Sequence, residues 1–67
     1  MMREHERVVL LNAVTEQRLK VGGVGTVVHV YADGKAFEVE FTTFDGRTAA
    51  VVTLEASHVR RVTERRL

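Results

Sequence analysis

Three histidines are the first candidates for metal chemistry in this chain: His5, His29 and His58. A zinc site needs several such side chains to converge at ligand distances. We expect His5 to lie in a frayed, charged end, and His29 and His58 are far apart along the chain. The sequence contains no cysteine, so no thiolate can bind a metal. The sequence therefore indicates neither a metal site nor a cofactor.

Acid–base or nucleophilic catalysis is equally poorly supported. Glu38 and Glu40 would need a pocket, and the interior of a small β-barrel is filled by side chains. Ser57 and His58 are sequence neighbours, and a serine in that position is expected to cap a turn rather than to act as a nucleophile. The sequence therefore predicts a protein that is not an enzyme.

Arginines are the candidates for phosphate contacts. Arg47, Arg60 and Arg61 would bind phosphates while Tyr31 or Phe44 stacks on bases. The net charge of +1 gives no global basic field of the kind expected in a dedicated nucleic-acid binder. Binding of RNA or DNA is therefore the alternative function. The run of arginines at the C-terminus is either a solvated tail or a phosphate-binding patch.

The length of 67 residues predicts one domain over 1–67, with an ordered core at about 7–62 and charged tails at 1–6 and 63–67. So short a chain buries only roughly 60% of its unfolded surface, and it has no disulfide to stabilise it. A closed barrel or self-association would supply the missing burial. There is no apolar run of about 20 residues, and the charged start lacks the core of a signal peptide, so we expect a cytoplasmic protein.

Two Asp-Gly pairs, Asp33-Gly34 and Asp45-Gly46, divide the stretch from Val24 to Leu54 into three strands. Asp-Gly tolerates the positive φ angles of a two-residue type I′ turn. Two such turns predict a register for both hairpins. The first hairpin then pairs Ala32 with Lys35, Val30 with Phe37, Val28 with Val39 and Thr26 with Phe41, and the second pairs Phe44 with Arg47, Phe41 with Ala50, Val39 with Val52 and Phe37 with Leu54.

This register places Phe37, Val39 and Phe41 on one face of the sheet, opposite apolar partners from both hairpins. A slip of one residue would turn that whole set outward. The opposite face is predicted to be mixed in polarity. It carries a row of His29, Glu38 and Thr53, a row of Val27, Glu40 and Val51, and Tyr31, Ala36 and Ala49 around them.

Apolar residues grouped on a face that should be wet indicate a contact surface. We therefore predict that Val27, Tyr31, Glu40 and Val51 bind another protein. The plainer alternative is that these are ordinary exposed strand residues, since strands favour valine.

The segments on either side complete the predicted topology. Arg7–Leu11 is β-branched and apolar, which favours a first strand that is covered on both sides or bent between two sheets. In the long connection 12–23, one helical turn over Thr15–Leu19 is expected, with Thr15 as its N-cap and with Leu19 and Val21 as apolar anchors.

Glycines 22, 23 and 25 are expected to permit a sharp turn and a bent strand, because neither a Lys-Ser/Thr pair nor a helix follows them as in a phosphate-binding loop. Glu55–His58 breaks the strand pattern and predicts a 3₁₀ turn. Val59–Val62 then forms a short last strand beside the first. The predicted fold is all-β: a small five-stranded SH3-like barrel with a long first loop and a one-turn 3₁₀ helix before the last strand.

The run Leu19-Lys20-Val21-Gly22-Gly23-Val24-Gly25-Thr26-Val27-Val28 resembles the L-x-x-G-x-x-G-x-V signature of SH3-like and KOW-type small barrels. With V-V-L-L at 8–11, F-E-V-E-F at 37–41, V-T-L at 52–54 and a final V-R-R-V, the chain is similar to an uncharacterised bacterial family of short stand-alone proteins. This domain of unknown function is often encoded beside another small gene, in arrangements that resemble toxin–antitoxin pairs.

The resemblance implies a binding module whose partner is the product of an adjacent gene, as an antitoxin or accessory protein, and it leaves a homo-oligomer open. The loop 12–23 carries only Arg18 and Lys20 as cations and no aromatic residue. It therefore departs from KOW proteins that bind RNA. The expected function is non-enzymatic protein binding.

Overall fold

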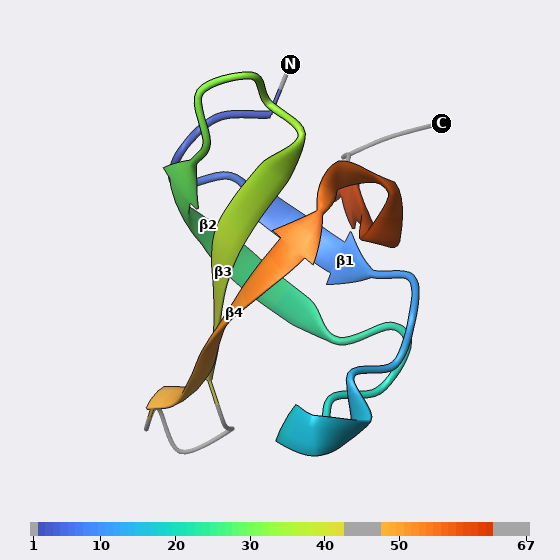
Figure 1. The fold of residues 1–67 in the computed structure, drawn as a ribbon. Coiled ribbons are helices and arrows are strands. Elements are labelled where there is room, and N and C mark those ends of the chain that lie inside the picture. Colours follow the sequence, from blue (N-terminus) through green and yellow to red (C-terminus); the bar gives the residue numbers. More distant parts are fainter. Residues whose placement is uncertain (1, 43–47, 63–67) are drawn as a thin grey trace, which may run out of the picture.

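Five antiparallel strands form one sheet in the computed structural model, which describes residues 2–42 and 48–62 (Figure 1). The elements, in chain order, are β1 (Arg7–Leu10), η1 (Thr15–Gln17), β2 (Val24–Val30), β3 (Ala36–Thr42), β4 (Thr48–Glu55), η2 (Ala56–His58) and β5 (Val59–Arg61). Both η elements are single 3₁₀ turns. The prediction of an all-β fold with a 3₁₀ turn before the last strand is confirmed.

The strand order is β4-β3-β2-β1-β5. β5 lies antiparallel to β1, with Leu10 opposite Val59, as predicted for the returning last strand. The sheet twists so strongly that β1 crosses behind β4 in the view of Figure 1. The described strands do not close into a complete barrel, because β5 pairs with β1 and not with β4, so both β4 and β5 remain edges.

One hydrophobic core lies on the concave side of this sheet. The strand alternation explains its membership, since every second residue of a strand points to the same face. β3 contributes Phe37, Val39 and Phe41, and β1 contributes alternate residues in the same way. The buried apolar side chains are Val8, Leu10, Val27, Phe37, Val39, Phe41, Leu54 and Val59.

The predicted register between β3 and β4 is confirmed. Phe41 lies opposite Ala50, Val39 opposite Val52, and Phe37 opposite Leu54. An irregularity follows Phe41, because the next pair along the ladder is Thr42 with Thr48. The Asp45-Gly46 turn and the predicted Phe44–Arg47 pair lie outside the described residues.

The predicted register between β2 and β3 is correct at one end and wrong at the other. Val30 lies opposite Phe37 as expected, but Val39 faces Val27 instead of Val28, and Thr26 faces Glu40 instead of Phe41. Two steps on β2, from Val27 to His29, match one step on β3, so Val28 is the extra residue of a β-bulge.

The bulge reverses the predicted position of Val27. Its side chain is fully buried in the core, whereas Val28 is 39% exposed. Val27 was predicted to be an outward contact residue, and that prediction is wrong. The reason is local: the inserted residue shifts the alternation of β2 by one from this point toward its N-terminal end.

The first hairpin turn is also different from the predicted two-residue turn. The backbone N–H of Gly34 donates to the carbonyl of Tyr31 at 2.8 Å, which makes Ala32 and Asp33 the central residues of a four-residue turn. Gly34 has a φ of 74°, while Asp33 does not have positive φ, so the turn is not type I′. The Asp33 carboxylate accepts the backbone N–H of Lys35 at 3.0 Å.

The long connection contains the predicted helical turn, with different ends. Val14 occupies the N-cap position and no side chain caps the turn, so the predicted role of Thr15 is wrong. Val14 and Leu19 form an isolated bridge, and both pack against the core. Val21 is 64% exposed and is therefore not an anchor.

Gly25 is a position on β2 where a side chain would collide with β3. A Cβ at this position would lie 2.6 Å from Cγ1 of Val39 and 2.9 Å from both the carbonyl oxygen of Glu40 and Cε1 of Phe41. Two of these three neighbours are buried core side chains, so they have little room to move. Glycine is required here by close packing, while Gly22, with φ of 93°, supplies the sharp turn before the strand.

Replacing Gly25 by alanine should destabilise the protein by about 1–3 kcal/mol, because the added methyl overpacks the core. Urea denaturation followed by circular dichroism measures the change. The control is Val24→Thr at the neighbouring exposed position, which we expect to change the free energy of unfolding by less than about 0.5 kcal/mol. Equal stability of Gly25→Ala and the wild type would contradict the close approach of β2 and β3.

Candidate interaction face

The side of the β2–β3–β4 sheet that points away from the core is called the outer face here. It consists of Thr26, His29, Tyr31, Glu38, Glu40, Val51 and Thr53. Two rows cross the three strands: His29, Glu38 and Thr53 lie opposite one another, as predicted. In the second row, Thr26 takes the place predicted for Val27, beside Glu40 and Val51.

Glu38 is the centre of a hydrogen-bond network on this face. One oxygen of its carboxylate, Oε2, accepts the hydroxyl of Tyr31 and also the hydroxyl of Thr53, the latter at 2.6 Å. The ring of Tyr31 meets the ring of His29 edge to face, with centroids 4.8 Å apart and planes at 87°. The network therefore fixes the Tyr31 ring at the end of β2.

These hydrogen bonds change the acidity of both partners in opposite directions. The pKa of Glu38 is lowered because Thr53 and Tyr31 donate to its ionised form, and nearby His29 adds to this. The pKa of Tyr31 is raised, chiefly because its hydroxyl donates to Glu38. At neutral pH the carboxylate is therefore a weak base and the phenol keeps its proton, which suits a positioning network better than proton transfer.

The N-terminal segment borders the outer face. The carboxylate of Glu4 lies 4.0 Å from Nδ1 of His29, and both side chains are half exposed. The backbone N–H of His5 donates to the carbonyl of Val27, and the carbonyl of Glu6 accepts the N–H of Val27 at 2.9 Å. Residues 5 and 6 thus extend the contact of β1 with β2 as far as Val27, the residue before the bulge.

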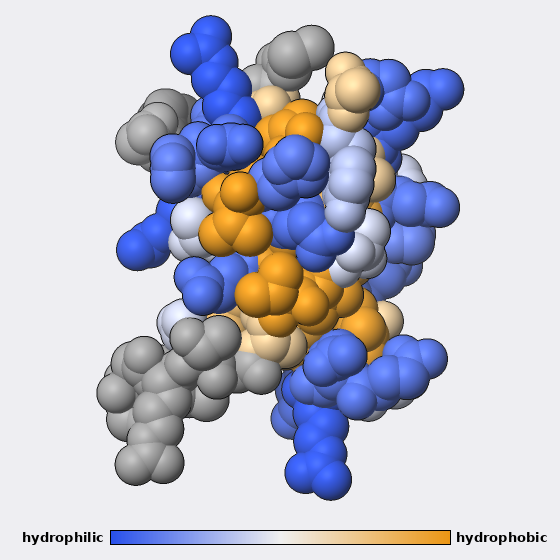
Figure 2. All heavy atoms as spheres, turned by 60° about the vertical axis from the view of Figure 1, so that its left-hand side comes forward, coloured by the Kyte–Doolittle hydropathy of each residue, from blue (hydrophilic) through white to orange (hydrophobic). Residues whose placement is uncertain are grey.

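The outer face combines apolar exposure with negative charge. Val51 is 52% exposed and Tyr31 is 40% exposed. Glu38 and Glu40 supply two carboxylates, and β2, β3 and β4 contain neither lysine nor arginine. Figure 2 shows hydrophobic side chains down the middle of one side of the molecule, with hydrophilic side chains among them and on both flanks.

Three of the four residues predicted to contact a protein lie on the outer face: Tyr31, Glu40 and Val51. Val27 does not, because it belongs to the core. Of the arginines predicted for phosphate binding, Arg60 and Arg61 lie exposed on β5, and Nε of Arg61 is 3.2 Å from the carboxylate of Glu6. Arg47 lies outside the described residues.

The sequence pattern placed Glu38 beside His29 and Thr53 but missed its bond with Tyr31. That contact depends on the side chain of Tyr31 reaching back across the hairpin toward β3. The sequence contained a signal for this bond. Tyr31 comes just before the turn and two residues after His29, and His29 pairs with Glu38.

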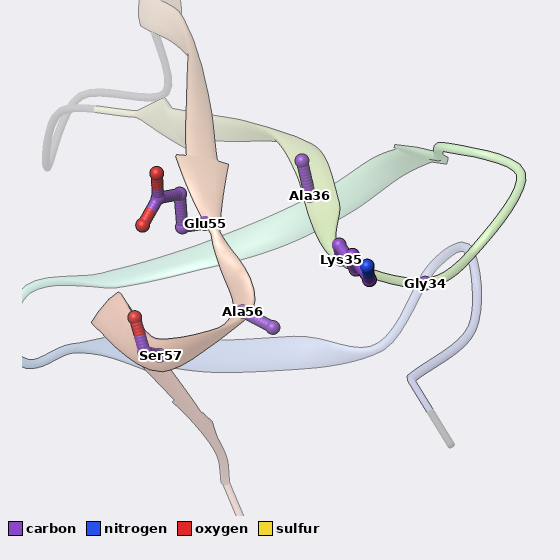
Figure 3. Close-up of a pocket in the computed structure, with 6 residues that line it drawn as sticks. All are labelled: Gly34, Lys35, Ala36, Glu55, Ala56 and Ser57. Atoms are coloured by element: carbon purple, nitrogen blue, oxygen red, sulfur yellow. The ribbon is translucent and has the colours of Figure 1, made fainter.

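A depression lies where the first hairpin meets the end of β4 (Figure 3). Its lining residues are Gly34, Lys35, Ala36, Glu55, Ala56 and Ser57. The backbone N–H of Ala56 donates to the carbonyl of Lys35 at 2.9 Å and ties the two sides together. The polar side chains of this lining, Lys35, Glu55 and Ser57, are exposed to solvent, so the depression encloses a ligand poorly.

No group of three or more histidine, aspartate or glutamate side chains in residues 2–42 and 48–62 is arranged to hold a metal ion. In the same residues, no helix has the length and apolar character needed to cross a bilayer.

Replacing Glu38 by glutamine should lower the melting temperature most at neutral pH. A lowered carboxylate pKa stabilises the fold above its ordinary value of 4.5, and this contribution is lost as the pH falls through the lowered pKa. A raised phenol pKa stabilises the fold below its ordinary value of 10.0, and this contribution is lost as the pH rises through the raised pKa. The difference between wild type and variant should therefore shrink at both ends of the range.

Melting temperatures of the two proteins across the pH range measure this profile. Glu40→Gln is the matched control, since it removes a carboxylate from the same face and strand. A difference between wild type and Glu38→Gln that is the same at every pH would contradict the role given to the network.

Comparison with known proteins gives one finding. Searches of the curated proteins and of the solved structures found no match. A family model described as a domain of unknown function, DUF4926, matches residues 4–61. The match spans all five strands, both 3₁₀ turns and every residue of the outer face. The chain therefore belongs to the DUF4926 family of domains of unknown function.

Proposed function

We propose that this protein is a non-enzymatic binding module that holds another protein on its outer face. The observation that carries the proposal is the composition of that face. Exposed Tyr31 and Val51 lie beside the carboxylates of Glu38 and Glu40, and β2–β4 bring no lysine or arginine to balance them. Apolar surface of this kind, in a small domain, is typical of a contact site.

The chemistry of the face indicates the chemistry of the partner. Two carboxylates beside exposed apolar side chains are complementary to a segment that carries arginine or lysine among apolar residues. The Glu38 network holds the Tyr31 ring before binding, so less side-chain freedom is lost when a partner packs against it. Tyrosine fixed in this way is a favourable anchor in protein interfaces.

Family resemblance supplies the identity of the partner in this proposal. Gene arrangements that resemble toxin–antitoxin pairs make the partner the product of an adjacent gene, in a bacterial cytoplasm. The module would then act as an antitoxin or accessory protein, by occluding its partner or by serving as a scaffold for it. The strand order β4-β3-β2-β1-β5, with η2 before the last strand, supports an SH3-like, KOW-type relationship.

The second candidate function is binding of RNA or DNA by the arginines. The exposed positions of Arg60 and Arg61 on β5 favour it. The ion pair of Arg61 with Glu6 weakens it, since a phosphate would have to compete with that carboxylate. A phosphate contact would weaken steeply as salt rises, because counterions are released on binding.

Replacing Val51 by aspartate should reduce recovery of the partner in a pull-down from native lysate by about tenfold or more, because a charge then replaces apolar contact area. Nuclease treatment in parallel and mass spectrometry identify what is retained. The control is Val21→Asp, an exposed valine in the loop between β1 and β2, which should leave recovery unchanged.

One dominant protein that survives nuclease and is lost with Val51→Asp supports the outer face as the contact. Retention that is abolished by nuclease and by Arg60→Ala, but not by Val51→Asp, would replace this proposal with the nucleic-acid alternative. Equal loss with Val51→Asp and Val21→Asp would also contradict it, because the effect would then follow added charge and not position.

A further inference from the structure

The two edges of the described sheet differ in how they are protected. β5 has three residues, two of them arginines. β4 has eight residues, and it carries no charged residue from Thr48 to Leu54. Proteins usually keep exposed edges from pairing with other chains by making them short or by placing charge or proline on them. β5 is short and charged, whereas β4 is long and carries neither charge nor proline from Thr48 to Leu54.

One hydrogen bond shows which backbone groups of β4 point toward its free edge. The N–H of Ala56 donates to the carbonyl of Lys35 at 2.9 Å. This bond flanks the Ala36–Glu55 pair, so that pair is of the non-hydrogen-bonded type. Because the two types alternate, the pairs of Glu38 with Thr53 and of Glu40 with Val51 are also non-hydrogen-bonded.

The N–H and C=O groups of Val51 and Thr53 therefore point away from β3, toward the free edge. β3 is the one strand that pairs with β4 in the described part of the chain. The backbone groups of Val52 and Leu54, in contrast, face β3 and complete its ladder.

We propose that β4 pairs antiparallel with β4 of a second copy of this chain, about a two-fold axis that places Val51 opposite the second copy's Thr53. In this register the N–H and C=O groups of both residues bond across the axis, which gives four backbone hydrogen bonds. The two Val52 side chains then face each other on the core side of the sheet. This pairing is independent of the outer-face contact proposed above.

A second copy fits this edge because the edge is complementary to itself. Residues 50–54 of both copies are uncharged, so the antiparallel register brings no like charges together. Val52 is half buried at the margin of the core, and a facing Val52 would cover it further. In the described residues, β4 is the one sheet edge without charge along most of its length, so a two-fold pairing closes at two copies instead of growing into a filament.

The pairing would also give so small a domain additional burial. A chain of this length without disulfides buries a low fraction of its surface alone. The ladder is short, so the dimer should be weak and depend on concentration. In the dimer, the outer faces of both copies lie on the same side of one continuous sheet.

Amide hydrogen exchange of the wild-type protein, measured by NMR at micromolar and at millimolar concentration, tests the pairing. The amides of Val51 and Thr53 should exchange roughly tenfold more slowly at the higher concentration, while those of Val52 and Leu54 are protected at both. Sedimentation velocity on the same samples should show a shift from monomer to dimer. A protein that stays monomeric at millimolar concentration, or Val51 and Thr53 amides that exchange equally fast at both, would overturn the proposal.

Replacing Val51 by proline distinguishes the contact at the free edge of β4 from the pairing of β4 with β3. Proline removes the N–H that points to the second copy and leaves the ladder with β3 complete, so the dimer should be lost. Val51→Thr keeps the backbone N–H and should keep the dimer. Persistence of the dimer in a folded Val51→Pro protein would overturn the proposal, and so would its loss in Val51→Thr. The wild-type exchange measurement decides the question if Val51→Pro does not fold.

Discussion

The β-bulge at Val28 is the constraint on which the rest of this structure depends. It lets β2 turn Val27 into the core and still bring His29 opposite Glu38 on the outer face. Without the extra residue, a single alternation would run along the whole strand, and one of these two placements would be lost. The bulge also adds local twist, which helps one sheet to wrap around its own core. The missing side chain of Gly25 leaves room for Val39 and Phe41 beside the N-terminal half of β2 in its shifted register.

With Val27 turned into the core, the outer face has a defined chemical character. Glu38 accepts two hydroxyl groups and stays ionised, and Tyr31 stays protonated and fixed against His29. Val51 continues the apolar surface beside Glu40. Positioned aromatic surface beside two carboxylates, on strands β2–β4 that contain no lysine or arginine, suits recognition of a basic, apolar partner better than it suits chemistry. The proposed pairing of β4 would double this face without covering it, since it uses the edge of the sheet and not its surface.

The sequence predicted the fold correctly where only one strand register turns the hydrophobic residues toward the core. In β3, Phe37, Val39 and Phe41 alternate with glutamates, and their register with β4 was correct. In β2, the run Val27-Val28-His29-Val30 has a valine in each of its two alternating sets, so periodicity alone could not locate a bulge. An Asp-Gly pair fits both a type I′ turn and the longer turn that is present, because each uses glycine at a positive φ. Val27 lies within this ambiguous run, and it was placed on the wrong face. Tyr31, Glu40 and Val51 lie outside the run, and they were placed correctly on the outer face.

Thiol labelling at positions 27 and 28 is the most direct test of this account, because the chain contains no cysteine of its own. Val27→Cys and Val28→Cys are each treated with a water-soluble maleimide under native conditions, and their labelling rates are compared with those in denaturant. The bulge predicts that the cysteine at position 27 is protected and that the cysteine at position 28 reacts readily. The reverse result, with position 28 protected and position 27 reactive, would mean that β2 runs in an uninterrupted register and that the outer face described here is the wrong one.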